Sequence, residues 1–136
     1  MRDWNSGIIE EFRAKGGKGI RGFGDSLLLL HVRGRRSGTV RVYPLAYHRD
    51  GERYVVAGSK GGAPQHPEWY RNLLANPDVT VEVGTERFRA RAIAIPRGPE
   101  RDRLYAEHAK PMPGFLEYEK KTKRIIPVVV LERVAE

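Results

Sequence analysis

The chain has 136 residues, enough for one domain with its own hydrophobic core. It contains no cysteine, which excludes disulfides and thiolate metal sites. Its 25 Lys and Arg residues against 17 Asp and Glu residues give a net charge of +8. That excess favours an anionic partner: a nucleic acid, an acidic membrane surface, or a phosphorylated or carboxylated small molecule.

The apolar segments are short. The longest run, Leu27–Leu30, cannot span a bilayer, and the first residues lack the apolar core of a signal peptide. We therefore expect a cytoplasmic protein that forms a single domain over residues 1–136.

The first element expected is an amphipathic helix within residues 1–15. Trp4, Ile8, Ile9 and Phe12 form an apolar stripe at helical spacing, and Gly16-Gly17 ends the pattern. Such a stripe favours a helix that packs over the end of a barrel. Peripheral contact with a membrane remains the alternative, although basic residues do not concentrate on the polar face.

A highly basic turn follows the first predicted strand. Residues 26–32 are apolar on both faces, which is typical of a buried strand, and a second strand is expected over residues 40–48. Between them, Arg33-Gly34-Arg35-Arg36-Ser37-Gly38 places three arginines within four positions. Their mutual repulsion favours an anion at this turn.

Asp50-Gly51 is a strong signal for a two-residue hairpin between this strand and the next, at residues 53–58. That turn predicts four cross-strand pairs: Arg49 with Glu52, Tyr47 with Tyr54, Ala46 with Val55, and Leu45 with Val56. Pro44 indicates a missing ladder partner or a bulge. The basic turn and the loop at Ser59 would then lie at the same end of adjacent strands.

The loop Ser59-Lys60-Gly61-Gly62 leads from that strand to a helix that begins near Pro67. Its backbone N–H groups, the helix dipole and Lys60 would suit an anion, whereas a solvated glycine turn is the alternative for the loop alone. If Arg35, Arg36 and Arg41 converge with Lys60, they form a clamp for phosphate and carboxylate groups.

The second half of the chain continues the alternation of strands and helices. Gly84-Thr85 predicts a hairpin that pairs Glu82 with Arg87, Val81 with Phe88, Val79 with Ala90, and Asp78 with Arg91. Helices are expected over residues 99–109 and 114–122, and a buried strand over residues 125–131. The four histidines have no paired ligand spacing, so we expect no metal site. The fold class predicted is mainly β with α connections, a curved sheet or small barrel of about six antiparallel strands.

Several blocks, in order along the chain, resemble the deazaflavin-dependent nitroreductase and quinone reductase family. They are Gly34-Arg35-Arg36-Ser37-Gly38, Arg41 with Tyr43-Pro44-Leu45, Val55–Pro64, His66–Leu73, Ala75-Asn76-Pro77 and Ile126-Pro127-Val128-Val129. The resemblance covers nearly the whole chain.

The resemblance implies a split β-barrel similar to those that bind FMN. It also implies the cofactor coenzyme F-420, an 8-hydroxy-5-deazaflavin with a phosphate and an oligoglutamate tail. The activity implied is hydride transfer from the reduced cofactor to a quinone or another small electrophile, such as a nitroaromatic compound. The acidic tail would give the net positive charge a partner.

The family's residues carry over to matching positions of this chain. The cofactor-binding residues implied are Arg35, Arg36, Ser37, Arg41, Val42, Tyr43, Ala57, Gly58, Ser59, Lys60, Glu68, Trp69, Tyr70, Arg71 and Asn72. Ser59 and Tyr118 are the candidates for offering a proton or hydrogen bond to the substrate, and Met112, Phe115 and Tyr118 for its pocket. Met112 and Phe115 replace tyrosines on the late helix, which favours an apolar quinone over a nitroimidazole. His31 and Val32 replace threonines that are usual in the family.

Other functions fit parts of the pattern. A related split barrel could use FMN or carry F-420 without catalysis. The net charge alone would also suit a nucleic-acid-binding domain, but the aromatic residues lie at spacings typical of a core rather than in a basic stripe. We therefore expect a small-molecule substrate and no nucleic acid.

Overall fold

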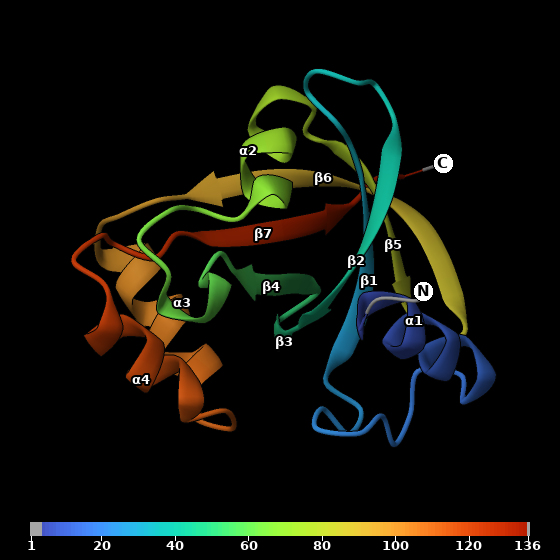
Figure 1. Cartoon of the computed structure of the whole chain (residues 1–136), viewed down its shortest axis with the longest axis horizontal. Helices are drawn as coiled ribbons and strands as arrows, with labels where there is room; N and C mark the ends of the chain where they lie inside the picture. The colour runs from blue at the N-terminus through green and yellow to red at the C-terminus, as the bar shows by residue number, and fades with distance from the viewer. Residues whose placement is uncertain (1–3, 136) are drawn as a thin grey trace.

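The computed structural model describes residues 4–135. Its elements, labelled in Figure 1, are α1 Trp4–Ala14, β1 Leu27–Arg33, β2 Val40–Ala46, β3 His48–Asp50, β4 Arg53–Ala57, the 3-10 turn η1 Lys60–Gly62, α2 Glu68–Ala75, β5 Asp78–Val83, β6 Glu86–Ile95, α3 Pro99–Ala109, α4 Gly114–Lys121 and β7 Val128–Arg133. The described part of the chain thus has seven strands, where the sequence predicted about six.

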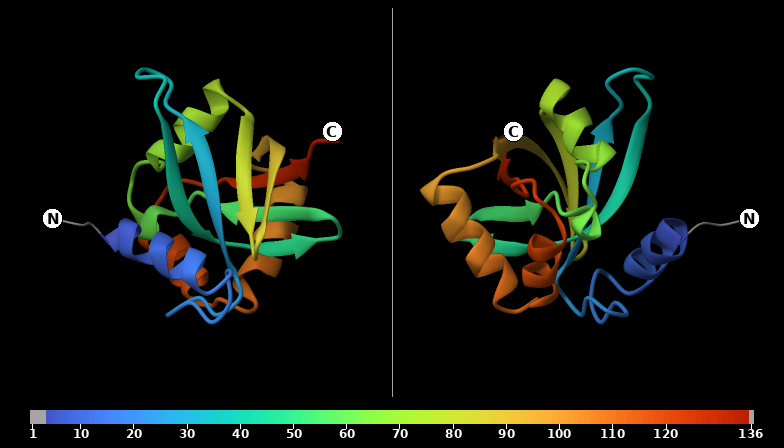
Figure 2. Two further views of the ribbon diagram at one scale, coloured as in Figure 1. Left: turned by 90° about the vertical axis from the view of Figure 1, so that its right-hand side faces the viewer. Right: turned by 60° about the vertical axis from the view of Figure 1, so that its left-hand side comes forward.

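All strands belong to one antiparallel sheet in the order β2-β1-β5-β6-β7-β4-β3. Its two edge strands, β2 and β3, follow each other in the chain and are separated only by Tyr47. The sheet must therefore curl until its edges meet at that corner, as Figures 1 and 2 show, and the edges diverge elsewhere. This is the split β-barrel that the sequence predicted.

The first predicted hairpin is wrong in register and in extent. The two-residue turn is Gly51-Glu52, with Gly51 at φ +63°, and Asp50 pairs with Arg53. The pair is favoured because Arg53 also forms an ion pair with the Asp50 carboxylate. Beyond it, the Tyr47 amide donates to the Ser26 carbonyl, so the predicted strand over residues 40–48 breaks there.

As a consequence, β2 pairs with β1 along its whole length and not with β4. Pro44 lies opposite Leu29 on an edge strand, where its missing N–H costs no ladder bond on the outer side. The expectation that Pro44 marks a missing partner is confirmed. The basic turn and the loop at Ser59 therefore do not lie at the ends of neighbouring strands, as the predicted hairpin required.

The remaining elements agree closely with the sequence. The hairpin of β5 and β6 has the predicted register, with Glu82 opposite Arg87 and Val81 opposite Phe88. α3 has the bounds expected for it, and α4 ends one residue earlier than expected. β7 begins three residues later than predicted, at Val128.

Three apolar clusters hold these elements together. The largest fills the inside of the curled sheet and includes Leu30, Val81 and Trp69 of α2. The second lies under α3 and α4, and the third lies between α1 and β1. Figure 2 shows α1 on one side of the sheet and α3 and α4 on the other.

α1 packs on the barrel as the sequence predicted. Ile8 and Phe12 of the expected stripe are fully buried and Ile9 is half-buried. The Trp4 side chain and residues 1–3 lie outside the described part of the chain. No helix within residues 4–135 has the length and apolar character needed to cross a membrane.

His31 of β1 is connected to α1 through Glu82. Its Nε2 is 2.6 Å from a carboxylate oxygen of Glu82, which also accepts two hydrogen bonds from Arg13 of α1. Burial tends to raise the pKa of Glu82, but the bonds from Arg13 and His31 lower it overall. The Glu82 carboxylate, which is partly buried, therefore links α1, β1 and β5.

Candidate cofactor and substrate site

The basic turn between β1 and β2 forms one pocket with the first turns of α2. We call it the arginine pocket; it measures about 290 Å³ and is lined by Gly34, Arg35, Arg36, Ser37, Arg41, Tyr43, Glu68 and Asn72. Seven of these eight residues are among the predicted cofactor-binding residues. The three arginines of the predicted clamp thus converge on one cavity, whereas Lys60, its fourth member, lines the neighbouring cavity instead.

Arg35 is held in place by α2. Its Nη1 donates to Glu68 Oε2 and to Asn72 Oδ1, each at 2.7 Å, and its backbone N–H also donates to Asn72. The hydrogen bond from Arg35 lowers the pKa of Glu68, so this carboxylate stays ionised. Asn72 is buried and its Oδ1 accepts both hydrogen bonds from Arg35, whereas Leu74 of the same helix is exposed. The turn therefore has a preset geometry.

A second cavity of about 410 Å³ adjoins the first at Tyr43. We call it the aromatic pocket, and its lining residues are Asn5, Phe23, Tyr43, Pro44, Leu45, Ala46, Ala57, Ser59, Lys60, Gly61, Pro67, Trp69, Phe115 and Tyr118. Its walls are mostly apolar, with the hydroxyls of Ser59, Tyr43 and Tyr118 and the ammonium of Lys60 as polar groups. Such a lining suits a planar, largely apolar ligand.

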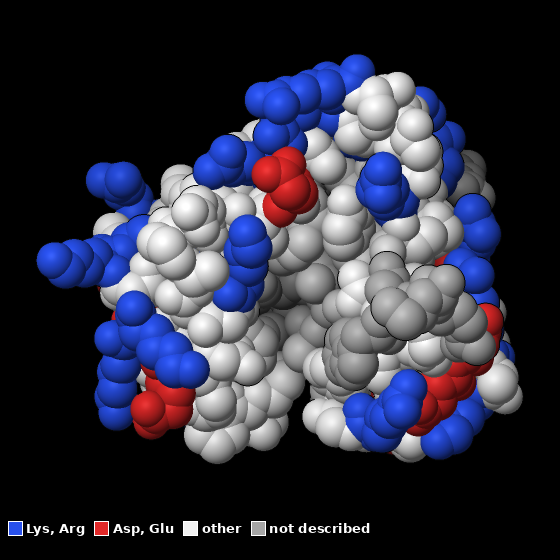
Figure 3. All heavy atoms as spheres, viewed as in Figure 1, with Lys and Arg blue, Asp and Glu red and all other residues white. Residues whose placement is uncertain are grey.

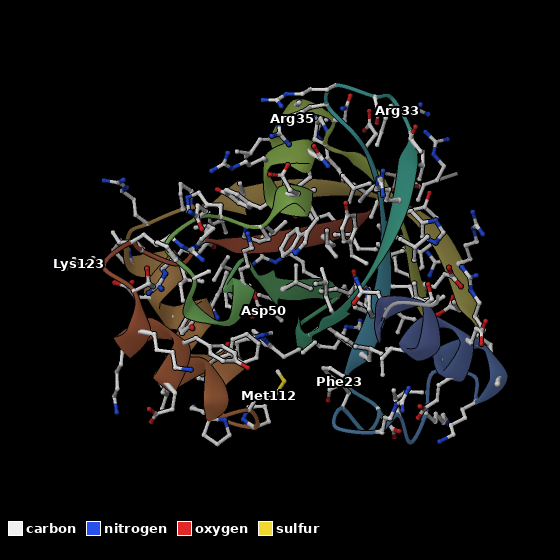
Figure 4. All side chains as sticks on the ribbon, in the orientation of Figure 1. Phe23, Arg33, Arg35, Asp50, Met112 and Lys123 are labelled. Atoms are coloured by element: carbon white, nitrogen blue, oxygen red, sulfur yellow. The ribbon has the colours of Figure 1, made fainter. Side chains whose placement is uncertain are left out.

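The two pockets lie in the gap between the diverging edges of the sheet. Figure 3 shows a hollow between two lobes with Lys and Arg side chains along its upper rim. In Figure 4, Arg35 lies at the upper end of this region, and Phe23 and Met112 lie on either side of the lower end. The site is therefore basic at one end and apolar at the other.

Most of the predicted site residues meet here. Thirteen of the predicted cofactor, catalytic and substrate residues line one or both pockets. The exceptions are Val42, which lies against α1, Gly58 and Tyr70, which are buried in the protein, Arg71, which is exposed, and Met112.

Sequence reasoning missed several apolar members of the aromatic pocket. Phe23 comes from the glycine-rich segment between α1 and β1, and Asn5 comes from the exposed part of α1. Neither residue carries a local signal. They reach the pocket only because α1 and the segment after it fold back beside β2, as Figure 1 shows.

A histidine pair lies behind the aromatic pocket. The Nδ1 atoms of His48 and His108 are 2.8 Å apart, and the His108 ring stacks edge-on against Phe115 at 4.4 Å. Burial lowers the pKa of His48 and, with the His48 charge, lowers the pKa of His108 to about 3. Both rings are therefore neutral at pH 7. Within residues 4–135, no group of three potential metal ligands gathers.

Comparison with known proteins agrees with the geometry. A family model described as F-420H(2)-dependent quinone reductase matches residues 5–133. An F-420H(2)-dependent quinone reductase of Mycobacterium tuberculosis is 43% identical over 108 residues, which cover 78% of this chain and 72% of that protein. The solved structure of an F-420-H2 dependent reductase has 35% identity and a TM-score of 0.72, and covers 79% of this chain and 94% of its own.

More distant structures share the architecture alone. The heme storage protein HutZ of Vibrio cholerae has 20% identity and a TM-score of 0.62, and the match covers 100% of this chain and 93% of that one. At such identity only the fold is comparable. The similarity supports the split barrel seen in the sheet topology.

Proposed function

Because the chain belongs to the F-420H(2)-dependent quinone reductase family, we propose that it binds reduced coenzyme F-420 between the arginine and aromatic pockets and reduces a quinone. One observation carries the proposal: a cavity lined by three arginines adjoins, at Tyr43, one lined mostly by aromatic and aliphatic side chains. A ligand with an anionic tail and a flat ring system needs both features side by side.

The residues present fit such a cofactor. Arg35, Arg36 and Arg41 supply guanidinium groups suited to bidentate contacts with phosphate and carboxylate oxygens. Trp69, Leu45 and Phe115 supply apolar walls from three different elements for a flat ring. Tyr43 lines both cavities, so one ligand can extend continuously from one to the other.

When bound, the reduced deazaflavin supplies the hydride. The chain's own part is to hold the ring and the acceptor in contact and to keep water away, which the apolar lining of the aromatic pocket favours. Ser59, on the loop beside β4, and Tyr118, on α4, both line this pocket and can donate hydrogen bonds to an acceptor that gains negative charge. Neither has to act as a nucleophile.

The lining favours a quinone over a nitroaromatic substrate. Phe115 and Tyr118 are the members of α4 that reach the pocket, and their rings stack edge-on at 5.3 Å. Only one of them carries a hydroxyl. A quinone needs an apolar surface and few hydrogen bonds, whereas a nitro group needs more polar partners as its charge develops.

The test is oxidation of F-420H2 by menadione, followed through the absorbance of the oxidised cofactor. We expect the protein to accelerate the reaction and a nitroimidazole to react at least tenfold more slowly under the same conditions. Titration of F-420 and FMN against the protein, followed by fluorescence, should show tighter binding of F-420.

Three outcomes would contradict the proposal. Binding of F-420 without acceleration would indicate a carrier, and tighter binding of FMN would indicate a flavin-dependent split barrel. Micromolar affinity for single-stranded DNA at physiological salt, without binding of F-420, would indicate a nucleic-acid-binding protein.

A further inference from the structure

Arg124 lies between α4 and β7 and extends its guanidinium toward the loop that follows β4. Nε donates to the Ala63 carbonyl at 2.9 Å, and Nη2 donates to the Ser59 carbonyl at 2.7 Å. Nη1 donates to the Gly58 carbonyl at 3.1 Å and lies 3.0 Å from His66 Nδ1. One side chain thus binds three carbonyls of a single loop.

The loop has a backbone conformation that needs such support. Lys60, at φ +48°, is the one residue other than glycine in the described part of the chain with a positive φ, and Gly61 and Gly62 follow it at +62° and +84°. A lysine rarely adopts this left-handed conformation, because its Cβ crowds the following carbonyl. The loop therefore depends on contacts outside itself to keep this shape.

The other side of the same loop faces the site. Ser59, Lys60 and Gly61 line the aromatic pocket, whereas Arg124 is not among its lining residues. Arg124 is thus placed behind the loop, where it cannot touch a ligand in the pocket but can fix the residues that do.

The loop also packs tightly against α4. A Cβ atom added to Gly62 would lie 2.8 Å from Lys121 Cβ and 2.9 Å from the Tyr118 carbonyl oxygen. Phe115 and Tyr118 of the same helix also line the pocket. Arg124 follows α4 closely in the chain. It therefore connects the loop over residues 58–63 to the helix that would contact the quinone.

His66 completes the arrangement. The distance to Arg124 Nη1 requires that His66 Nδ1 accept the hydrogen bond and therefore carry no proton. Burial, and then the charges of Arg124 and Arg71, lower the pKa of His66, so that this neutral state is present at pH 7. The guanidinium accordingly keeps all four of its partners at neutral pH.

From these contacts we propose that Arg124 is a positioning residue of the reductase: it holds the carbonyls of Gly58, Ser59 and Ala63 so that Ser59 and Lys60 face the cofactor ring. The inference rests on the proposed function and adds to it a residue outside the pocket. Without this guanidinium, the carbonyls of Gly58 and Ala63 lose their donor and that of Ser59 keeps only the Gly62 amide, so the loop relaxes away from its left-handed conformation. The loop must then be reordered each time the cofactor binds.

Arg101 provides a matched control. It is buried on α3, where Nε donates to the Ile126 carbonyl at 2.9 Å and the guanidinium pairs with Asp102 and with Glu119 of α4. It makes no contact with the loop over residues 58–63 among its hydrogen bonds and ion pairs. Arg101→Met and Arg124→Met therefore each remove a guanidinium group near α4. Only Arg124→Met removes hydrogen bonds to the loop.

The experiment compares wild type, Arg124→Met, Arg124→Lys and Arg101→Met. Hydrogen exchange at the Gly62 and Ala63 amides, which donate to the Ser59 and Lys60 carbonyls, reports on the loop in the cofactor-free protein. Fluorescence titration gives the dissociation constant for F-420, and steady-state assays give kcat and KM with menadione. Thermal unfolding measures stability separately.

For Arg124→Met we expect exchange at these amides at least tenfold faster, a dissociation constant at least tenfold higher, and a lower kcat. Arg124→Lys keeps the charge but reaches fewer carbonyls. It should fold well, and its exchange rates, dissociation constant and kcat should lie between those of Arg124→Met and wild type. Arg101→Met should lower the unfolding temperature but leave loop exchange and cofactor affinity within twofold of wild type.

The inference is overturned if Arg124→Met and Arg124→Lys change loop exchange and cofactor affinity no more than Arg101→Met does. Arg124 would then serve stability alone. If wild type fails to bind F-420 or to oxidise F-420H2, the proposed function is wrong instead. The exchange measurement in the cofactor-free protein still decides whether Arg124 holds the loop, so the two failures are distinguishable.

Discussion

Arg35 is held in a fixed position by other residues and still lines the arginine pocket, where it can contact a ligand. Its guanidinium is held by Glu68 and Asn72, yet Arg35 lines the arginine pocket together with Arg36 and Arg41. Glu68 is exposed, so a ligand anion can share Arg35 with it or displace it. Holding a flexible side chain in place before binding reduces the entropy that binding costs.

Replacing Arg35 with methionine should weaken the binding of F-420 about 10- to 100-fold, because one charge-assisted hydrogen bond contributes about 1.5–3 kcal/mol. Fluorescence titration at low salt measures the change. Arg91→Met is the matched control, since Arg91 is exposed on β6 and does not line either pocket. Equal losses in both variants would mean that net charge, rather than the arginine pocket, determines affinity.

His48 and His108 should make the protein sensitive to mild acid. Their pKa values are lowered in the folded protein, so the unfolded chain binds more protons below its ordinary histidine pKa of about 6.5. The stability they contribute is complete above that pH and is lost as the pH falls. Asp50, whose pKa hydrogen bonds from Arg103 and Arg53 lower to about 2, loses its contribution only in stronger acid.

We therefore expect the free energy of unfolding in urea to fall between pH 7 and pH 5.5. The slope should approach about 1.4 kcal/mol per pH unit for each histidine that stays neutral in the folded state. His108→Leu, which replaces a fully buried ring by an apolar side chain, should remove at least half of this slope. A variant that loses stability with acid as steeply as wild type would show that other groups are responsible.

At the scale of elements, the loop over residues 59–63 packs against α4, and both elements line the aromatic pocket. Gly62 approaches Lys121 and the Tyr118 carbonyl so closely that no side chain fits, whereas Gly61 has open space around its α-carbon. Both glycines have positive φ angles, +62° for Gly61 and +84° for Gly62. The two glycines therefore share a left-handed backbone conformation, and they differ mainly in the contact of Gly62 with α4.

Gly61→Ala and Gly62→Ala separate backbone strain from packing. Gly61→Ala should cost about 1–2 kcal/mol of stability, the cost of a side chain in the left-handed conformation. Gly62→Ala should cost roughly 1–3 kcal/mol more, because the loop and α4 have to move apart. Urea unfolding measures both changes, and equal losses would show that the contact with α4 is not tight.

At the scale of the whole molecule, the charge is uneven with respect to the site. The chain has a net charge of +8, and the arginine pocket gathers three arginines at one end of a cavity whose other end is apolar. The electrostatic field of these charges attracts an anionic ligand. Salt screens this attraction, and the screening length falls from roughly 10 Å at 0.1 M to 3 Å at 1 M ionic strength.

Affinity for F-420 should accordingly fall about tenfold between 0.05 M and 0.5 M NaCl, because its tail is anionic. The KM for menadione, which carries no charge, should change less than twofold over the same range. Titrations and steady-state assays at several salt concentrations test both expectations. Equal salt dependence for the two ligands would contradict the division of the site into a charged and an apolar end.

The elements of this fold were largely predictable from local pattern. The β5–β6 hairpin has the expected register because Glu82–Arg87 and Asp78–Arg91 place opposite charges across the strands while Val81–Phe88 is apolar. The first hairpin was not predictable in this way, since Asp50-Gly51 is a sound turn signal that the ion pair between Asp50 and Arg53 overrides. The separation of β2 from β4 depends on the closure of the whole sheet.

By itself, the sequence determined the helices and most strands, the basic turn and the glycine loop, because each depends on residues close together in the chain. Only the tertiary structure decided that these segments form one continuous site. The curl that brings Tyr43 of one edge strand near Ala57 and Ser59 arises from seven paired strands. Nor could local sequence reveal Arg124, whose partners lie more than fifty residues away, because a lone arginine between a helix and a strand carries no pattern until the chain has folded.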